Sequence, residues 1–142
     1  MGILVFLAFT LTAFAAVDPS IKGEKRRAIQ EAMQEHIDHN TADGHYVLYD
    51  AIADDLLKLK LAKLHDGIVK KADYYVSCAD FHDRNGVYFD LDFLVIEKDG
   101  KFRALQGIVH KVGNVKRKYH LKTELGTKTQ KLGSGRGGRG RA

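Results

Sequence analysis

The feature that most constrains the fold of this chain is a run from Asp73 to Thr123, in which strand-like segments are separated by short turn sequences. Those turn sequences are Arg84-Asn85-Gly86, Asp99-Gly100 and Gly113-Asn114. Gly and Asn accept the positive φ angles that tight hairpin turns require. The run therefore predicts four consecutive antiparallel strands.

The segment before this run predicts one amphipathic helix and a short strand. From Glu24 to His39, apolar residues recur at helical spacing and leave charged and polar residues for water. The segment 40–44, Asn-Thr-Ala-Asp-Gly, ends the helix, and Tyr46 to Tyr49 is typical of a strand.

Residues 51–65 carry two conflicting signals. Their Ala, Leu and Lys content favours a helix, whereas Leu57-Lys58-Leu59-Lys60-Leu61 alternates with the period of a strand. We predict a strand from Leu56 to His65, preceded by a loop or a single helical turn over Ala51 to Asp55, with a helix as the open alternative. The fold class is then α+β, with one long N-terminal helix packed on an antiparallel sheet.

The two ends of the chain differ in composition from the middle. The apolar stretch from Ile3 to Phe14 is too short for a bilayer, which needs about 20 apolar residues, and Ala13-Phe14-Ala15 fits a signal cleavage site. We therefore predict a signal peptide over residues 1–15 and an exported protein, periplasmic or secreted. Because no basic residue precedes Lys22, an uncleaved anchor is the alternative, and no later stretch predicts a membrane span.

The formal net charge of +5 is concentrated at the C-terminus. Residues 126–142 are rich in Gly, contain five basic side chains and no acidic one, and are predicted to be disordered. Residues 16–125 form the single predicted domain, whose charges balance. We therefore expect no specific nucleic-acid partner. The only cysteine, Cys78, excludes an internal disulfide.

The turns also predict which side chains share a face. A three-residue loop at Arg84-Asn85-Gly86, with Gly86 in the left-handed conformation, places Phe81 opposite Phe89. The face that would pack against the helix then carries Tyr75, Ala79, Phe81, Val87, Phe89, Leu91, Phe93 and Val95. Two-residue turns after it add Phe102, Ala104, Gln106, Ile108, His110, Val115, Arg117, Tyr119 and Leu121, with His110 and Arg117 at the rim.

The opposite face collects polar side chains, and the simplest interpretation is a solvated surface. The candidate binding residues are those of this face together with His65 and His110. They are His65, Cys78, Asp80, His82, Asp90, Asp92, Arg103, His110 and Lys111. Asp80, Asp90 and Asp92 repel one another across adjacent strands. We expect Arg103 and Lys111 to offset that repulsion, in preference to a divalent cation. The chain has no H-E-x-x-H, paired C-x-x-C or EF-hand loop, so we predict no metal and no cofactor.

Four short motifs carry a family resemblance. They are Lys63-Leu64-His65-Asp66, Cys78-Ala79-Asp80-Phe81, Phe89-Asp90-Leu91-Asp92-Phe93 and Val109-His110-Lys111. In that order, behind a signal peptide and a helix, they resemble a group of small exported bacterial proteins of uncharacterised function. The resemblance implies a cystatin-like or NTF2-like architecture, a long helix held against a curved sheet. The Gln-Val-x-Ala-Gly loop of cystatins is absent, which argues against protease inhibition.

Three functional classes stay open from the sequence. We favour a non-catalytic binding domain for an unknown protein or small polar ligand, because the polar groups are spread over a sheet face. The alternatives are a metal protein that uses Asp80, Asp90 and Asp92, and an NTF2-like enzyme with a His/Asp or Cys/His site. A homodimer is also left open, since Leu94, Ile96, Leu105 and Val109 would interrupt the polar face with apolar surface.

Overall fold

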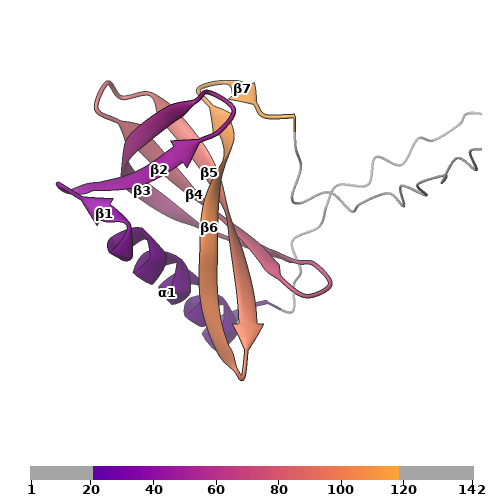
Figure 1. Cartoon of the computed structure of the whole chain (residues 1–142). Coiled ribbons are helices and arrows are strands. Elements are labelled where there is room, and N and C mark those ends of the chain that lie inside the picture. The colour runs from indigo at the N-terminus through magenta and orange to yellow at the C-terminus, as the bar shows by residue number, and fades with distance from the viewer. Residues whose placement is uncertain (1–20, 119–142) are drawn as a thin grey trace, which may run out of the picture.

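The computed structural model describes residues 21–118, which form one helix and a seven-stranded antiparallel sheet (Figure 1). Each strand pairs with its neighbours in sequence, so the sheet is a simple meander. This architecture confirms the predicted α+β class. The elements are α1 (Gly23–His39), β1 (Thr41–Ala42), β2 (His45–Asp50), β3 (Asp55–Lys70), β4 (Tyr75–Asp83), β5 (Tyr88–Lys98), β6 (Lys101–Val112) and β7 (Val115–Lys116).

Several predictions fall on residues outside the described range. The signal peptide over 1–15, the tail over 126–142 and the face assignments of Tyr119 and Leu121 are among them. Within 21–118, α1 is too short and too polar to cross a bilayer.

The helix α1 matches its predicted range almost residue for residue. It buries Ile29, Ala32, Met33 and Ile37 against the sheet. Its C-terminal carbonyls are satisfied locally: the Asn40 side chain donates to the His36 carbonyl at 2.8 Å, and the Thr41 hydroxyl donates to the Ile37 carbonyl at 2.7 Å. The chain then turns directly into β1.

The ambiguous segment is a strand, so the helical alternative is wrong. β3 starts at Asp55 and continues past His65 to Lys70, longer than predicted. Leu59 is buried in the core while Lys58 and Lys60 beside it are exposed. Alternate burial on the sheet therefore outweighs the helical propensity of Ala, Leu and Lys.

The hairpin turns have the predicted geometry. In the β4–β5 loop, Gly86 has φ 78°, Asp83 accepts the backbone N–H groups of Asn85 and Val87 at 2.8 Å, and Phe81 lies opposite Phe89. The two-residue Asp99-Gly100 turn pairs Lys98 with Lys101. The Gly113-Asn114 turn likewise pairs Val112 with Val115.

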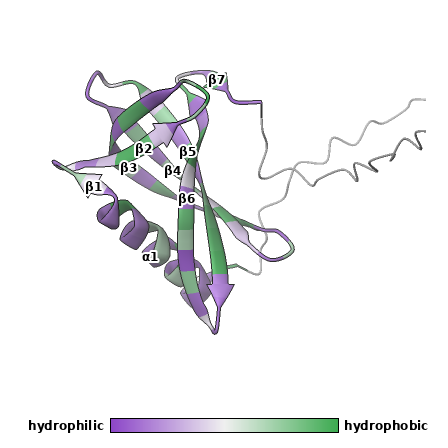
Figure 2. Ribbon diagram, in the orientation of Figure 1, coloured by the Kyte–Doolittle hydropathy of each residue, from purple (hydrophilic) through white to green (hydrophobic). Residues whose placement is uncertain are grey.

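The sheet face that packs against α1, called the helix face below, contains the hydrophobic core. An aromatic group of Tyr46, Phe81 and Phe93 lies at its centre, with ring centroids 5.4 to 6.2 Å apart. Along the strands, hydrophobic and hydrophilic residues alternate (Figure 2). Other buried members of this core include Leu59, Ile68, Ala79, Phe89, Leu91, Val95, Ala104 and Val109.

Two bulges in β6 overturn the predicted faces of its second half. Leu94 pairs with Gln106 and Val95 with Ala104, so Leu105 is an extra residue; in the same way His110 is extra between Val109 and Lys111. Each bulge shifts the alternation by one residue. Val109 is therefore buried in the core, instead of facing outward as predicted. Gln106, Ile108 and His110 leave the helix face.

Two further predicted core residues are exposed. Val87 lies in the loop before β5, and Val115 belongs to a two-residue edge strand that only β6 flanks. Neither place allows packing from both sides. The burial of Val109 also removes it from the apolar patch that could have favoured a homodimer.

A close approach at Gly107 provides a test of this packing. A Cβ atom there would lie 2.8 Å from the Tyr46 hydroxyl oxygen and 3.1 Å from Phe93 Cε1. We expect Gly107→Ala to lower the free energy of unfolding by about 1–3 kcal/mol, measured by urea denaturation.

The loss of stability caused by Gly107→Ala should be smaller in a Tyr46→Phe background, because that change removes the hydroxyl oxygen nearest to the added Cβ. Leu105→Ala, at a half-exposed position, is the control and should change stability by about 0.5 kcal/mol or less. An equal penalty in both backgrounds would contradict the predicted contact.

Candidate functional site

Polar side chains from four strands meet on the sheet face opposite α1, called the site face below. On β4 and β5 they alternate with buried core residues, which fixes their direction. The polar cluster, as we call this group, consists of His65, Cys78, Asp80, Tyr88, Asp90, Asp92 and His110.

A wide bulge in β3 brings His65 to the cluster. Leu64 pairs with Ala79 and Ile68 pairs with Ser77, so residues 65–67 lie opposite Cys78 alone. The His65 carbonyl accepts a hydrogen bond from Gln30 Nε2 of α1 at 3.0 Å. Its ring Nε2 lies 2.8 Å from Asp80 Oδ1. The bulge therefore joins the helix to the site face.

Asp80 is held by two neighbours at one oxygen. The Tyr88 hydroxyl donates to Asp80 Oδ1 at 2.8 Å, the same atom that His65 contacts. Burial acts to raise the pKa of Asp80, but these hydrogen bonds and the nearby His65 and Lys63 charges outweigh it, so the pKa is lowered. Burial and the bond to Asp80 raise the pKa of Tyr88.

The most deeply buried part of the cluster joins Cys78 to His110. The Cys78 thiol donates to Asp92 Oδ1 at 2.9 Å. His110 Nδ1 lies 3.5 Å from the other Asp92 oxygen and 3.4 Å from Asp90 Oδ2. Cys78 and Asp92 are fully buried. His110 reaches the carboxylates because it is the extra residue of a bulge, which corrects its predicted place at the rim of the helix face.

The spacing of these atoms fits a metal ion. Two groups have ligand atoms that all lie within 4.8 Å of one another: His65, Cys78 and Asp90, and Asp90, Asp92 and His110. Nitrogen and oxygen ligands of a tetrahedral Zn²⁺ lie about 3.3–3.4 Å apart, given bonds of about 2.0–2.1 Å. The distances from His110 Nδ1 to the two carboxylates are close to this value.

Three predicted site residues lie outside the cluster or at its edge. His82 is exposed, with its ring centroid 5.9 Å from that of Tyr88. Arg103 pairs with Ile96 near the other end of β6. Lys111 pairs with Asp90 and places its Nζ 5.5 Å from the centroid of the Tyr88 ring.

The close side-chain partners of the three aspartates differ from the prediction, because they are histidines, which carry a charge only when protonated. Asp80 pairs with His65, and Asp90 and Asp92 both pair with His110. Histidines thus occupy the place where Arg103 was expected. Tyr88, absent from the predicted site residues, could have been found from its position on the same strand face as Asp90.

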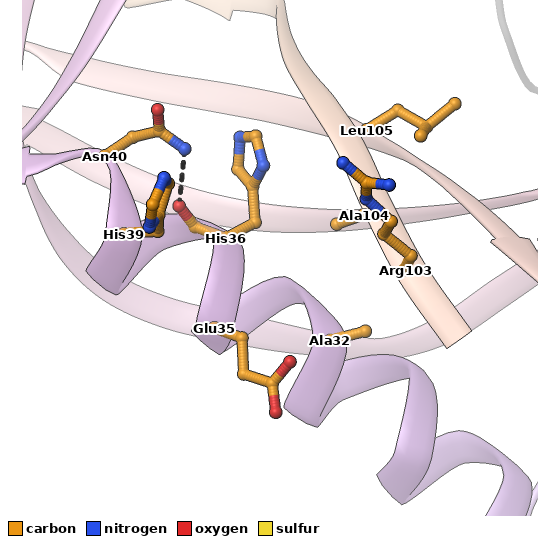
Figure 3. A pocket seen from close by; sticks show the side chains of 8 residues that line it. All are labelled: Ala32, Glu35, His36, His39, Asn40, Arg103, Ala104 and Leu105. Atoms are coloured by element: carbon orange, nitrogen blue, oxygen red, sulfur yellow. Dashed lines mark hydrogen bonds between the residues drawn. The ribbon is translucent and has the colours of Figure 1, made fainter. Parts of the chain in front are cut away.

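Apart from the polar cluster, a polar hollow lies between α1 and β6 (Figure 3). Its volume is about 480 Å³, and His36 of α1 faces Arg103 of β6 across it. Burial lowers the pKa of His36, although a hydrogen bond to the Ala104 backbone opposes this, and the lowered pKa favours the neutral ring. The other lining residues are Ala32, Glu35, His39, Asn40, Ala104 and Leu105.

Comparison of the chain with protein families, with curated protein sequences and with solved structures finds no match to any of them. The functional argument therefore rests on the geometry of the described residues.

The lowered pKa of Asp80 predicts a specific acid sensitivity. Its carboxylate stabilises the fold above the unfolded pKa of about 3.9, and that contribution is lost as the pH falls through the lower folded pKa. By urea denaturation, the native chain should have a higher free energy of unfolding than Asp80→Asn, and this difference should become smaller below about pH 4.

The exposed Asp73→Asn is the matched control and should follow the native chain at every pH. If the difference in free energy of unfolding between the native chain and Asp80→Asn stayed constant down to acid pH, the lowered pKa of Asp80 would be contradicted.

Proposed function

We propose that this domain binds a divalent transition-metal ion, best matched by Zn²⁺, through Asp90, Asp92 and His110. The observation that supports this most is the position of His110 Nδ1, 3.4 and 3.5 Å from two carboxylate oxygens. Imidazole and carboxylate are ordinary Zn²⁺ ligands. Ca²⁺ is a poorer fit, because it takes six to eight oxygen ligands.

Burial and charge support the same proposal. The side chain of Asp92 is 1% exposed and that of Asp90 is 15% exposed, and they lie on one face of one strand. Buried carboxylates are costly unless positive charge compensates them. A divalent ion would supply two positive charges where His110 supplies at most one. Binding to the native state alone would then stabilise the fold.

The surroundings of Cys78 favour binding over catalysis. A reactive cysteine is a thiolate in an electropositive, partly exposed place. Cys78 is buried and its thiol donates to a carboxylate. The side chains of Asp90, Asp92 and His110 are also largely buried, at 15%, 1% and 14% exposed, which limits the access of a substrate to an ion held among them. This supports the non-catalytic binding domain predicted from the sequence and proposes the ion as its ligand.

A small polar ligand in the hollow between α1 and β6 is the second candidate. Arg103 makes no ion pair with another residue of the range 21–118, and it faces the hollow. Its guanidinium would suit a carboxylate or phosphate group. Such a ligand should lose affinity in Arg103→Ala, which leaves the polar cluster intact.

We further propose, from the resemblance of the four motifs, that the chain belongs with the small exported bacterial proteins of cystatin-like or NTF2-like architecture. Export after cleavage behind Ala15 is part of this proposal. Edman sequencing of the protein from a fractionated bacterial host, with Ala16 found first, would support it. Retained Met1 in the cytoplasmic fraction would contradict it.

Thermal unfolding with and without metal tests the proposed function. At free Zn²⁺ 100 times above its Kd, binding should add about 2.7 kcal/mol, a rise of several degrees in Tm over the same protein in EDTA. His110→Ala and Asp90→Asn should reduce that rise, and the exposed His82→Ala should keep it. An identical Tm in EDTA and Zn²⁺ would refute the proposal.

Asp90→Asn separates metal binding from a purely structural role. In EDTA this variant should be at least as stable as the native chain, because it removes one of two neighbouring like charges. A large loss of stability in EDTA would show that Asp90 supports the fold by itself.

A further inference from the structure

We infer that the polar cluster holds two metal ions, with Asp90 shared between them. The first ion lies among Asp90, Asp92 and His110, and the second among His65, Cys78 and Asp90. This inference rests on the proposed function, since it assumes that the first position binds metal.

The distances separate the two positions. Within each group the ligand atoms lie no more than 4.8 Å apart, but the two groups have only Asp90 in common. Ligands of one ion lie at most about 4.6 Å apart, twice the longest bond of about 2.3 Å. The two histidines belong to different groups, and we therefore assign each histidine to its own ion. A carboxylate has two oxygens and can bridge two ions about 3.5–4 Å apart, as in known two-metal sites.

The second position has the outer contacts that metal-binding histidines commonly have. Such a histidine usually gives its other ring nitrogen to a carboxylate, which sets its tautomer and orientation. Asp80 contacts Nε2 of His65, so we assign the ion to Nδ1 of the same ring, and the Tyr88 hydroxyl donates to Asp80 in turn. In this arrangement Asp80 is a positioning residue that orients His65, and it is not one of the metal ligands as the sequence-based alternative had it.

The bulge of β3 lies directly beside Cys78. Residues 65–67 lie opposite this one residue, and the His65 carbonyl bonds to Gln30 of α1 at 3.0 Å. The regular ladder between β3 and β4 is therefore interrupted at the position inferred for the ion. Bulges of this kind are frequent next to binding sites.

Charge also favours a second ion. Asp80, Asp90 and Asp92 carry three negative charges when ionised, and metal binding would add a fourth on Cys78 as its thiol proton passes to solvent and a metal–sulfur bond forms. A single divalent ion at the first position, where Cys78 keeps its proton, leaves one negative charge in excess, whereas two ions balance the three carboxylates and the thiolate. The sulfur ligand makes the second position the softer one, suited to Zn²⁺ or Co²⁺.

Native mass spectrometry of the full chain during Zn²⁺ titration tests the inference. The native chain should saturate at two ions, and His65→Ala and His110→Ala should each saturate at one. His82→Ala should still take two. Saturation of the native chain at one ion, or of His65→Ala at two, would overturn the second position and leave metal binding intact. No bound ion at all would overturn the proposed function as well.

Co²⁺ gives a readout that depends on the sulfur. Thiolate bound to Co²⁺ adds an ultraviolet charge-transfer absorption, which should appear in the native chain and in His110→Ala and disappear in Cys78→Ser. Asp80→Asn should keep two ions at saturation but weaken the second about 10–100-fold, while Asp73→Asn changes nothing. Absence of the absorption from the native chain, or unchanged affinity in Asp80→Asn, would overturn the assignment of these residues.

Discussion

The pairing of β4 with β5 governs both faces of the sheet, because side chains alternate along each strand. The loop of Arg84 to Gly86 sets that pairing, with Asp83 capping the turn and Gly86 adopting a positive φ. A shift of one residue in the register between β4 and β5 would move Asp90 into the core and Phe89 to the site face. The hydrophobic core and the polar cluster therefore depend on the same few backbone angles. A change in this loop would affect stability and binding together.

The turns made most of the fold predictable. Gly and Asn at defined positions specify hairpin type, and the alternation of Leu and Lys in 57–61 specifies a strand despite its helical composition. The bulges were not predictable, since Leu105 and His110 occur among residues of ordinary strand composition. Ile108 and Val109 are both apolar, so their order gives no sign of which one is buried.

The same limit applied to the candidate site. Alternation placed Cys78, Asp80, Asp90 and Asp92 on one face, and the structure brings them together. It could not place His110, whose position depends on a bulge, nor show that His65 folds toward Asp80. The expected compensation by Arg103 is wrong because Arg103 lies near the start of β6 while the aspartates adjoin its end. Sequence alternation gives the face of a residue, but its partner along the strand depends on the register.

The bulges in β6 have a consequence for association between chains. Beyond its short pairing with β7 and the hydrogen bond from Arg117 N–H to the His110 carbonyl at 2.7 Å, the outer edge of β6 from Lys101 to Val109 pairs with no other strand of residues 21–118. An unpaired edge is a template for strand addition and for the growth of aggregates. Leu105 and His110 interrupt the regular spacing of backbone donors and acceptors along this edge, so an incoming strand could match only a few of them at a time. The irregularities that turn His110 toward the carboxylates thereby also protect the domain against polymerisation through its edge.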